Sequence, residues 1–516
     1  MQKTPGILLL EGNKTYGRTL NKKRMYYKCI PNDSKQSPVL IPYELLIGFV
    51  KKFTNRYVLY TVQYEKDMEN INQKYAILQD NIGEVNDLDA FIQYRIHCRN
   101  LFFSTNVFNK MIREFNFLEI LNRIITRSDY QVVMCDEPVI TIDPASCQDF
   151  DDGFSVVNPN RIRIHIANPA LWIDTMQLWD MIPNRTTTLY LPNKKEPMLP
   201  PILSENWCSL KQTKEPRIAF TLEAEFNELG EVVHERSRLF NSSIHIHENY
   251  VYETPECFND MTYIHLKTLA EKRANKSLDS HEVVEHWMIF MNEYCGKILA
   301  NKKTGIFRTA QYISDERVIP ENIHITKDMQ KVIKEWGRIS GKYSLWEPSL
   351  AHIGLQISDY VHITSPIRRL VDMVNQMILM NVNWNQHAQS FIDKHLTSVT
   401  LAEINRQNKE SRKLQQECEN VWWIAHSPDA LYQIYTGMIF DILSNNNDNI
   451  NGNQNEKTIV VYIETLKKMI YIKMKQFDDS LLKLYSEHVF RPYYFENEGN
   501  MYRKIRWQLV EKSREN

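Results

Sequence analysis

The chain has 516 residues and a mass of 61.2 kDa, which excludes a single small module because domains usually hold roughly 100–200 residues. Hydrophobic residues make up 43% of the chain and charged residues 24%, values that exclude a disordered chain of low hydrophobicity and high charge. The 62 lysines and arginines balance 63 aspartates and glutamates, so a polyanion would have to bind a local basic surface.

Short apolar runs separated by polar turns predict strands in the first hundred residues. The runs are 6–10, 25–30, 45–50 and 57–62, and their spacing suits a small five-stranded barrel. Between 88 and 127 the apolar residues recur at helical spacings instead. This change of period predicts two helices that lead into the next domain.

The segment from about 131 to 425 is the longest continuous unit, and it mixes strand-like with helical runs. Its clearest predicted strands and helices are 139–142, 161–166, 219–226, 282–299 and 397–422. The last of these helices carries a basic stripe of Arg406, Lys409, Arg412 and Lys413. Such a stripe is typical of a solvated helix face, and contact with RNA is the alternative interpretation.

Four aspartates lie within one ten-residue window directly after the first of these strands: Asp143, Asp149, Asp151 and Asp152. A surface turn could hold them, but the flanking Phe150 and Phe154 favour a partly buried position. Carboxylates held there repel one another unless a cation neutralises them. Oxygen ligands without a Cys or His pair favour Mg²⁺ or Mn²⁺ over zinc, and the glycine and glutamate of an EF-hand calcium loop are missing. The cluster therefore predicts metal-assisted phosphoryl chemistry.

Two further segments are candidates for phosphate and base contacts. In 360–373, Pro366 breaks the chain and Arg368 and Arg369 follow at the opening of a helix, an arrangement suited to phosphate binding. Pairing of Arg368 with Asp372 is the structural alternative.

The segment 186–211 contains four prolines, which indicate a long ordered loop and not a helix or a central strand. Such a loop can place Tyr190 against a nucleobase or a sugar.

Strand patterns return near the end of the chain, at 432–443, 457–464 and 469–475, and again suit a small barrel. The tract 445–455 between the first two consists of Asn, Asp, Gly, Gln and Ile, and we expect it to be a disordered loop.

The eight cysteines are scattered singly, which is typical of reduced thiols. No apolar run approaches the length of a membrane span or of a signal-peptide core. We therefore expect a cytoplasmic protein without a membrane contact.

The three candidate segments, together with HIANPALWI (165–173), VVEHWMIFMN (283–292) and HIGL (352–355), resemble the ribonuclease II (RNB) family of 3′-to-5′ exoribonucleases. The resemblance is close from 131 to 425. It implies an α+β multidomain fold in which a central RNB α/β catalytic domain is flanked by OB-fold β-barrels. The implied domains are a cold-shock-like RNA-binding barrel at 1–86, a helical connector at 87–130, the RNB domain at 131–427, and a C-terminal RNA-binding barrel at 428–516 with a disordered Asn-rich loop at 444–456.

The resemblance also implies an activity and a set of site residues. The activity is Mg²⁺-dependent hydrolysis of single-stranded RNA to nucleoside 5′-monophosphates and a short end product, with Mn²⁺ as a substitute metal. Asp143, Asp149 and Asp152 would hold the metal, and Asp151, Arg368 and Tyr190 would be catalytic. The implied RNA-binding residues are Tyr190, which clamps the 3′-terminal nucleotides, Arg368, which steadies the scissile phosphate, and Glu285, Tyr360 and Arg369.

Four positions depart from the family pattern: Gly153, Asn168, His286 and Leu370. None of them removes an expected metal ligand, but Asn168 and His286 are expected to shift metal affinity or base contacts. A non-catalytic RNA-binding scaffold and another metal-dependent phosphodiesterase are the competing interpretations. We expect a monomer, and the sequence leaves open whether a helicase or an RNA-decay complex assists it.

Overall fold

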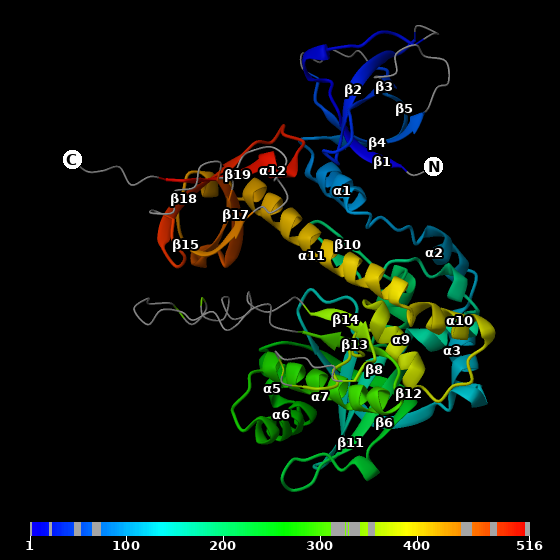
Figure 1. Cartoon of the computed structure of the whole chain (residues 1–516). Coiled ribbons are helices and arrows are strands. Elements are labelled where there is room, and N and C mark those ends of the chain that lie inside the picture. Colours follow the sequence, from blue (N-terminus) through cyan, green and yellow to red (C-terminus); the bar gives the residue numbers. More distant parts are fainter. Residues whose placement is uncertain are drawn as a thin grey trace.

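The computed structural model describes residues 3–19, 23–45, 53–63, 74–310, 326, 329, 341–348, 355, 357–444, 457–474 and 482–510. A small barrel at the N-terminal end and a curled sheet at the C-terminal end lie apart from a larger central body, and the long helix α11 (Ser398–His426) reaches from that body toward both (Figure 1). Within this part of the chain, no helix is both long and apolar enough to cross a membrane.

The N-terminal strands form a closed barrel in the order β1-β2-β3-β5-β4, with β3 and β5 parallel and the other pairs antiparallel. Alternate residues of β2, such as Tyr27 and Cys29, point into the barrel because successive strand residues face opposite sides. The predicted flanking barrel is confirmed here, although 46–50 of one predicted strand lie outside the described residues. The strands are β1 (Thr4–Leu8), β2 (Met25–Pro31), β3 (Val39–Tyr43), β4 (Arg56–Gln63) and β5 (Lys74–Glu84).

Residues 87–130, all of them described, fold into three α-helices, so the prediction of two was wrong. The third helix begins where the side chain of Asn116 accepts a hydrogen bond from the Glu119 amide, a cap that divides one apolar run into two helices. The helices are α1 (Leu88–Cys98), α2 (Asn106–Ile112) and α3 (Phe117–Thr126).

A second closed barrel, in the order β11-β12-β6-β7-β8, forms the centre of the large body. Isoleucines of its strands, such as Ile140, Ile164 and Ile166, are buried in the large apolar core, and the buried His165 bonds to Ser155 and Thr221. The strands predicted at 139–142, 161–166 and 219–226 all lie in this barrel. Its strands are β6 (Val133–Asp143), β7 (Asp152–Asn158), β8 (Arg161–Ala167), β11 (Arg217–Glu225) and β12 (Arg238–Val251).

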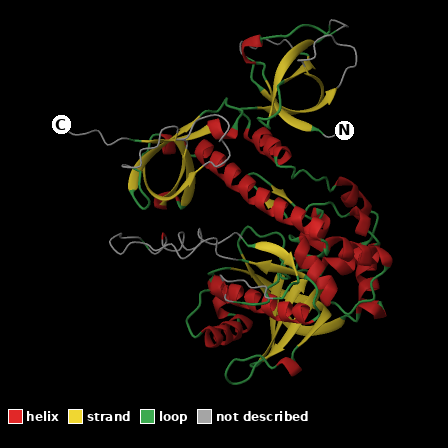
Figure 2. Cartoon of the chain, viewed as in Figure 1, coloured by secondary structure: helices red, strands yellow, loops and turns green. Residues whose placement is uncertain are grey.

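Helices surround this central barrel (Figure 2). The helices predicted at 282–299 and 397–422 are present as α7 and α11. The helices of the body are α4 (Pro169–Met176), α5 (Pro255–Asn259), α6 (Met261–Ala274), α7 (Ser280–Asn301), α9 (Leu370–Leu379) and α10 (Gln386–His395).

We predicted a long loop for the proline-rich segment 186–211, but part of this segment forms regular secondary structure. It contains a two-stranded hairpin of β9 (Leu189–Tyr190) and β10 (Lys195–Glu196), followed by one helical turn at Ile202–Trp207. Another hairpin joins β13 (Ile306–Thr309) to β14 (Lys342–Leu345).

The C-terminal strands form a five-stranded antiparallel sheet in the order β17-β16-β15-β18-β19. Figure 1 shows this sheet curled round on itself, but no ladder between β17 and β19 closes it among the described residues. All of the expected Asn-rich loop except Ser444 lies outside the described residues. The elements are β15 (Tyr435–Ser444), β16 (Lys457–Ile463), β17 (Lys468–Met474), β18 (Glu487–Tyr494), α12 (Met501–Lys504) and β19 (Ile505–Leu509).

The end units are fastened to the body through α1 and α11. Arg95 of α1 forms an ion pair of 2.8 Å with Glu417 of α11, and Arg99 also bonds Glu417. An apolar cluster that includes Phe91, Leu189 and Leu414 packs α1, the β9 hairpin and α11 together. These contacts fix the hairpin that carries Tyr190.

Candidate active site

The four aspartates lie at one end of the central barrel. Asp143 ends β6, Asp152 begins β7, and the connection between them carries Asp149 and Asp151. Backbone bonds hold this connection in place, because the Ala167 amide donates to the Asp151 carbonyl at 2.8 Å. The acids are therefore positioned by strand ends and not by a free surface turn.

Burial makes the negative charge of this cluster costly. Asp149 is 9% exposed and Asp151 is 3% exposed. Burial, with added repulsion from neighbouring aspartates, raises the pKa of Asp143 to about 6 and that of Asp152 to about 8. The Oδ2 atoms of both residues are buried and lack a hydrogen-bond partner among the described residues. A cation would satisfy these two oxygens.

The carboxylate of Asp151 is held by the segment that precedes α9. The Ile367 amide donates to its Oδ1 at 3.0 Å, and Arg368 Nε donates to its Oδ2 at 3.1 Å. Burial raises the pKa of Asp151 to about 7, although the charge of Arg368 acts in the opposite direction. Asp372 is bound by Arg369 at 2.8 Å, so the alternative pairing of Arg368 with Asp372 is wrong.

The hairpin of β9 and β10 brings two side chains to Asp149. The Tyr190 hydroxyl donates to Asp149 Oδ2 at 3.1 Å, and Lys195 Nζ lies 3.3 Å from Oδ1. Lys195 is not among the residues that the sequence predicted for the site. The only feature of the sequence that connects it to the site is its position five residues after Tyr190.

The residues before Tyr190 also form backbone hydrogen bonds with the segment that contains Arg368. The Thr188 amide donates to the Arg368 carbonyl at 3.0 Å, and the Leu370 amide donates to the Thr186 carbonyl at 3.0 Å. Tyr190 itself is 41% exposed. The structure thus brings Asp143, Asp149, Asp151, Asp152, Tyr190 and Arg368 together from three separate segments of the chain.

Tyr360 and Glu285 are not bonded to the aspartate cluster. Tyr360 is 7% exposed, and its hydroxyl accepts a hydrogen bond from Asn292 Nδ2 at 3.1 Å. Glu285 lies on the exposed face of α7 and has no hydrogen bond to the aspartate cluster. The structure therefore does not join these two residues directly to the acids.

The described residues contain no preformed group of three or more His, Cys, Asp or Glu side chains that could hold a metal ion. Lys195 and Tyr190 contact Asp149, and Arg368 and the Ile367 amide contact Asp151. The donors left open, Oδ2 of Asp143 and of Asp152, are carboxylate oxygens. Their chemistry fits a hard divalent cation.

Comparison with known proteins connects this site to a family. A family model described as "RNB domain" matches residues 131–263 and 257–385. Ribonuclease R of Chlamydia pneumoniae is 24% identical over 420 residues, which cover 67% of this chain and 61% of that protein. Exoribonuclease 2 of Psychromonas ingrahamii is 24% identical over 406 residues, which cover 63% of this chain and 60% of that protein. The chain carries an RNB domain and is a distant homologue of the ribonuclease R and exoribonuclease II family.

The chain spans less than two thirds of the length of these curated relatives. Its fold resembles that of Mycoplasma genitalium RNase R in complex with ribose methylated single-stranded RNA, with a TM-score of 0.70, 15% identity, and coverage of 98% of this chain and 89% of that one. It also resembles yeast Ssd1, a pseudonuclease, with a TM-score of 0.61, 12% identity, and coverage of 96% and 68%. Because these likenesses include a pseudonuclease, the fold does not decide whether the RNB domain is active.

The family departures of the RNB domain lie in structural positions. Asn168 is fully buried, accepts a hydrogen bond from the Leu171 amide at the start of α4, and donates to Asn241. His286 accepts a hydrogen bond from Arg273 Nε, and burial lowers its pKa to about 4. Leu370 is buried at the start of α9. None of these three residues forms a hydrogen bond to an aspartate of the cluster, whereas Gly153, the fourth departure, directly follows Asp152 in β7.

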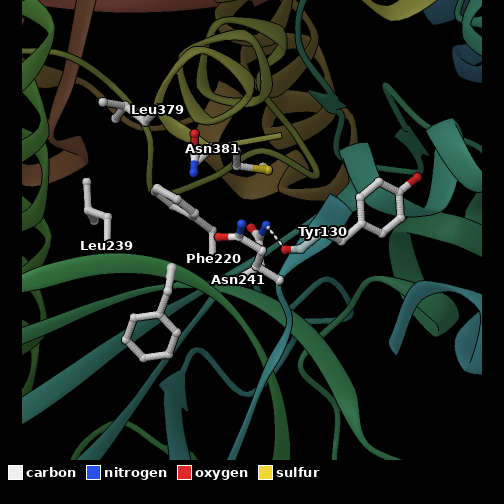
Figure 3. Close-up of a pocket in the computed structure, with 9 residues that line it drawn as sticks. Tyr130, Phe220, Leu239, Asn241, Leu379 and Asn381 are labelled. Carbon is white, nitrogen blue, oxygen red and sulfur yellow. Dashed lines mark hydrogen bonds between the residues drawn. The ribbon is translucent and has the colours of Figure 1, made fainter. Parts of the chain in front are cut away.

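A hollow of about 80 Å³ lies near Asn241, where the side-chain amide donates to the Tyr130 carbonyl (Figure 3). Its lining includes Phe220, Leu239 and Met380 and none of the six clustered site residues. A space of this size holds water and not a nucleotide, so it does not compete with the aspartate cluster as the candidate site.

Proposed function

We propose that this protein is a divalent-metal-dependent 3′-to-5′ exoribonuclease that degrades single-stranded RNA to nucleoside 5′-monophosphates and a short end product. One observation carries the proposal: Asp151 is held by Arg368 beside two buried aspartate oxygens that have no hydrogen-bond partner in the described part of the chain. A protein that only used the fold as a scaffold would have no need to keep this costly arrangement of charges.

Mg²⁺, or Mn²⁺ in its place, would be held by Asp143 and Asp152, with Asp149 as a third ligand, and would activate water and neutralise charge on the phosphate. In the net reaction, a P–O bond forms to water and the bond from phosphorus to the 3′ oxygen of the preceding nucleotide breaks. The released nucleotide keeps its 5′ phosphate, and the shortened RNA regains a 3′ hydroxyl. No reductant, oxidant or nucleotide cofactor is required.

The side chains of the chain itself position the RNA. Arg368 bonds Asp151 through Nε and Ser365 through Nη2, so its guanidinium is fixed beside the aspartate cluster, where it would steady the charge that develops on the scissile phosphate. The half-exposed ring of Tyr190 offers a face on which a terminal base can stack. We also propose that Arg369, Glu285 and Tyr360 contact RNA.

The N-terminal barrel and the curled C-terminal sheet would gather single-stranded RNA by backbone charge and stacking. We infer a role in RNA turnover or processing by a cytoplasmic monomer. Assistance from a helicase or an RNA-decay complex stays a prediction to be tested.

The test uses RNA labelled at its 5′ end, incubated with Mg²⁺ with and without EDTA. We expect wild type to shorten the RNA from its 3′ end, and EDTA or Asp151→Asn to prevent this. Asp180→Asn, at an exposed aspartate outside the cluster, is the matched control and should keep activity. If wild type binds the RNA but leaves it at full length with either metal, the non-catalytic scaffold becomes the better interpretation.

A further inference from the structure

Lys195 binds two acids at once, one aspartate of the cluster and a glutamate outside it. Its Nζ is 3.3 Å from Asp149 Oδ1 and 2.8 Å from Glu205 Oε1, and its side chain is 16% exposed. The hairpin register places it directly opposite Tyr190, whose hydroxyl donates to the other oxygen of Asp149. Both oxygens of Asp149 are therefore occupied by side chains of one hairpin.

The other expected metal ligands differ from Asp149 in this respect. Asp143 and Asp152 each keep one buried oxygen without a partner among the described residues. The charge of Asp149 is already neutralised by an ammonium group. Lysine carries a positive charge at neutral pH, and Lys195 contacts the carboxylates of both Glu205 and Asp149.

We propose that Lys195 is a built-in cation of the metal site, which holds Asp149 when no metal is bound and releases it to an incoming divalent ion while remaining on Glu205. Lys195 would then be a positioning residue that acts through Asp149 and sets the metal affinity of the site. The inference rests on the proposed function, because it requires a divalent ion at Asp143 and Asp152.

Glu205 makes this exchange physically reasonable. An ammonium group carries three donors, so Lys195 can give up its bond to Asp149 and stay neutralised by the shorter contact to Glu205. The incoming ion must nevertheless displace a buried charge-assisted hydrogen bond, which costs affinity. Removing the Lys195 charge should therefore tighten metal binding.

The probe is Mn²⁺ alone, and its free concentration is followed by electron paramagnetic resonance during titration. We expect Lys195→Met to bind Mn²⁺ about tenfold more tightly than wild type, a change equivalent to about 1.4 kcal/mol. Lys195→Arg keeps the charge and should stay near the wild-type affinity. Lys194→Met is the matched control, because Lys194 pairs with Glu196 and Gln93 and does not contact Asp149.

A double-mutant cycle separates a contact through Asp149 from a general effect of charge. In an Asp149→Asn background, Lys195→Met should no longer change the Mn²⁺ affinity. If the tightening persists there, or if Lys194→Met causes the same tightening, the inference is overturned. Melting temperatures of all variants show whether each one is folded, and Lys195→Arg supports the comparison if Lys195→Met is unstable.

The outcomes also distinguish this inference from the proposed function. If wild type binds Mn²⁺, Asp152→Asn abolishes binding and Lys195→Met changes nothing, the role of Lys195 is wrong and the metal site stands. If neither wild type nor Lys195→Met binds Mn²⁺, the metal-dependent function fails, and the role of Lys195 fails with it.

Discussion

Arg368 and Asp151 lie 217 residues apart in the sequence and are joined by a hydrogen bond of 3.1 Å from Nε to Oδ2. The Ile367 amide donates to the other oxygen of the same carboxylate at 3.0 Å. A single turn before α9 thus fixes both the acid and the guanidinium. The cluster and the turn cannot shift independently, because each supplies the hydrogen-bond partner of the other.

This contact predicts that Arg368→Lys is not a conservative change. Lysine is a point charge on a flexible stem and cannot keep the Nε bond to Asp151 while presenting further donors to a phosphate. We expect the rate of RNA shortening to fall about 10²–10³-fold, the effect of losing one donor that stabilises developing charge. Single-turnover digestion of 5′-labelled RNA measures it.

Arg236→Lys serves as the control for the Arg368 variant, because Arg236 is an exposed arginine that pairs with Glu225 outside the cluster. It should retain the wild-type rate. An Arg368→Lys protein that is folded and equally fast would show that this guanidinium has no part in the reaction.

Sequence patterns predicted the parts of this site that are local. Asp143, Asp149, Asp151 and Asp152 stand in one short window between apolar residues, and the strands and long helices of the body have clear periods of two or 3.6 residues. The fold class followed from these elements and from the family resemblance.

The contacts between segments could not be predicted in this way. The strands β9 and β10 are too short to show a period, so nothing in the sequence indicated that Lys195 would lie opposite Tyr190 and reach Asp149. The division of the connector into three helices depends on the single cap at Asn116. Short-range patterns do not contain the information that pairs Arg368 with Asp151, which lies 217 residues away in the sequence.

The buried aspartates predict an unusual pH dependence of stability in the metal-free protein. Burial raises the pKa of Asp143, Asp151 and Asp152 to about 6, 7 and 8, so the folded state binds more protons than the unfolded state. Their contribution to the free energy of unfolding is fully present below about pH 4 and is lost as the pH rises through these values. Melting in EDTA should therefore occur at lower temperature near pH 8 than near pH 6.

Two comparisons check the origin of that pH dependence. Asp152→Asn removes the group with the most strongly raised pKa, so the fall in melting temperature above about pH 7 should become smaller. Mn²⁺ should raise the melting temperature more at the higher pH, because metal binding requires the deprotonated carboxylates. An unchanged profile in Asp152→Asn would assign the pH dependence to other groups.

The two properties of Tyr190 predict different effects for two substitutions. Tyr190→Phe removes the hydrogen bond to Asp149 and keeps the ring, whereas Tyr190→Ala removes both. Stacking of a base on an aromatic ring is worth about 1–3 kcal/mol. We expect Tyr190→Ala to weaken binding of single-stranded RNA roughly tenfold or more and to change the length of the end product, while Tyr190→Phe keeps both near wild type.

Fluorescence anisotropy with labelled RNA in EDTA measures the binding step without digestion, and a denaturing gel with Mg²⁺ gives the end product. If Tyr190→Phe and Tyr190→Ala lost the same amount of RNA affinity, the hydroxyl group of Tyr190 and not its ring would be the group that matters for RNA binding.

Lys504 connects the C-terminal sheet to the N-terminal part of the chain through a hydrogen bond to Val85, and we predict that this contact stabilises the protein. It is fully buried, and its Nζ donates to the carbonyls of Val85, Glu496 and Glu498 at 2.9, 2.7 and 3.1 Å. Burial lowers its pKa to about 8. Lys504→Met leaves these carbonyls without their donor, and we expect a loss of about 1–3 kcal/mol in stability and faster proteolysis near β19.

Lys214→Met, at an exposed lysine, is the control for Lys504→Met and should leave stability unchanged. The pH dependence supplies a second readout. Because the folded state holds the Lys504 proton less tightly than the unfolded state, wild-type stability gains from this group as the pH rises from about 8 to about 10. That gain should disappear in Lys504→Met. A variant that kept both the wild-type melting temperature and the wild-type pH profile would show that the three carbonyl contacts do not hold the sheet in place.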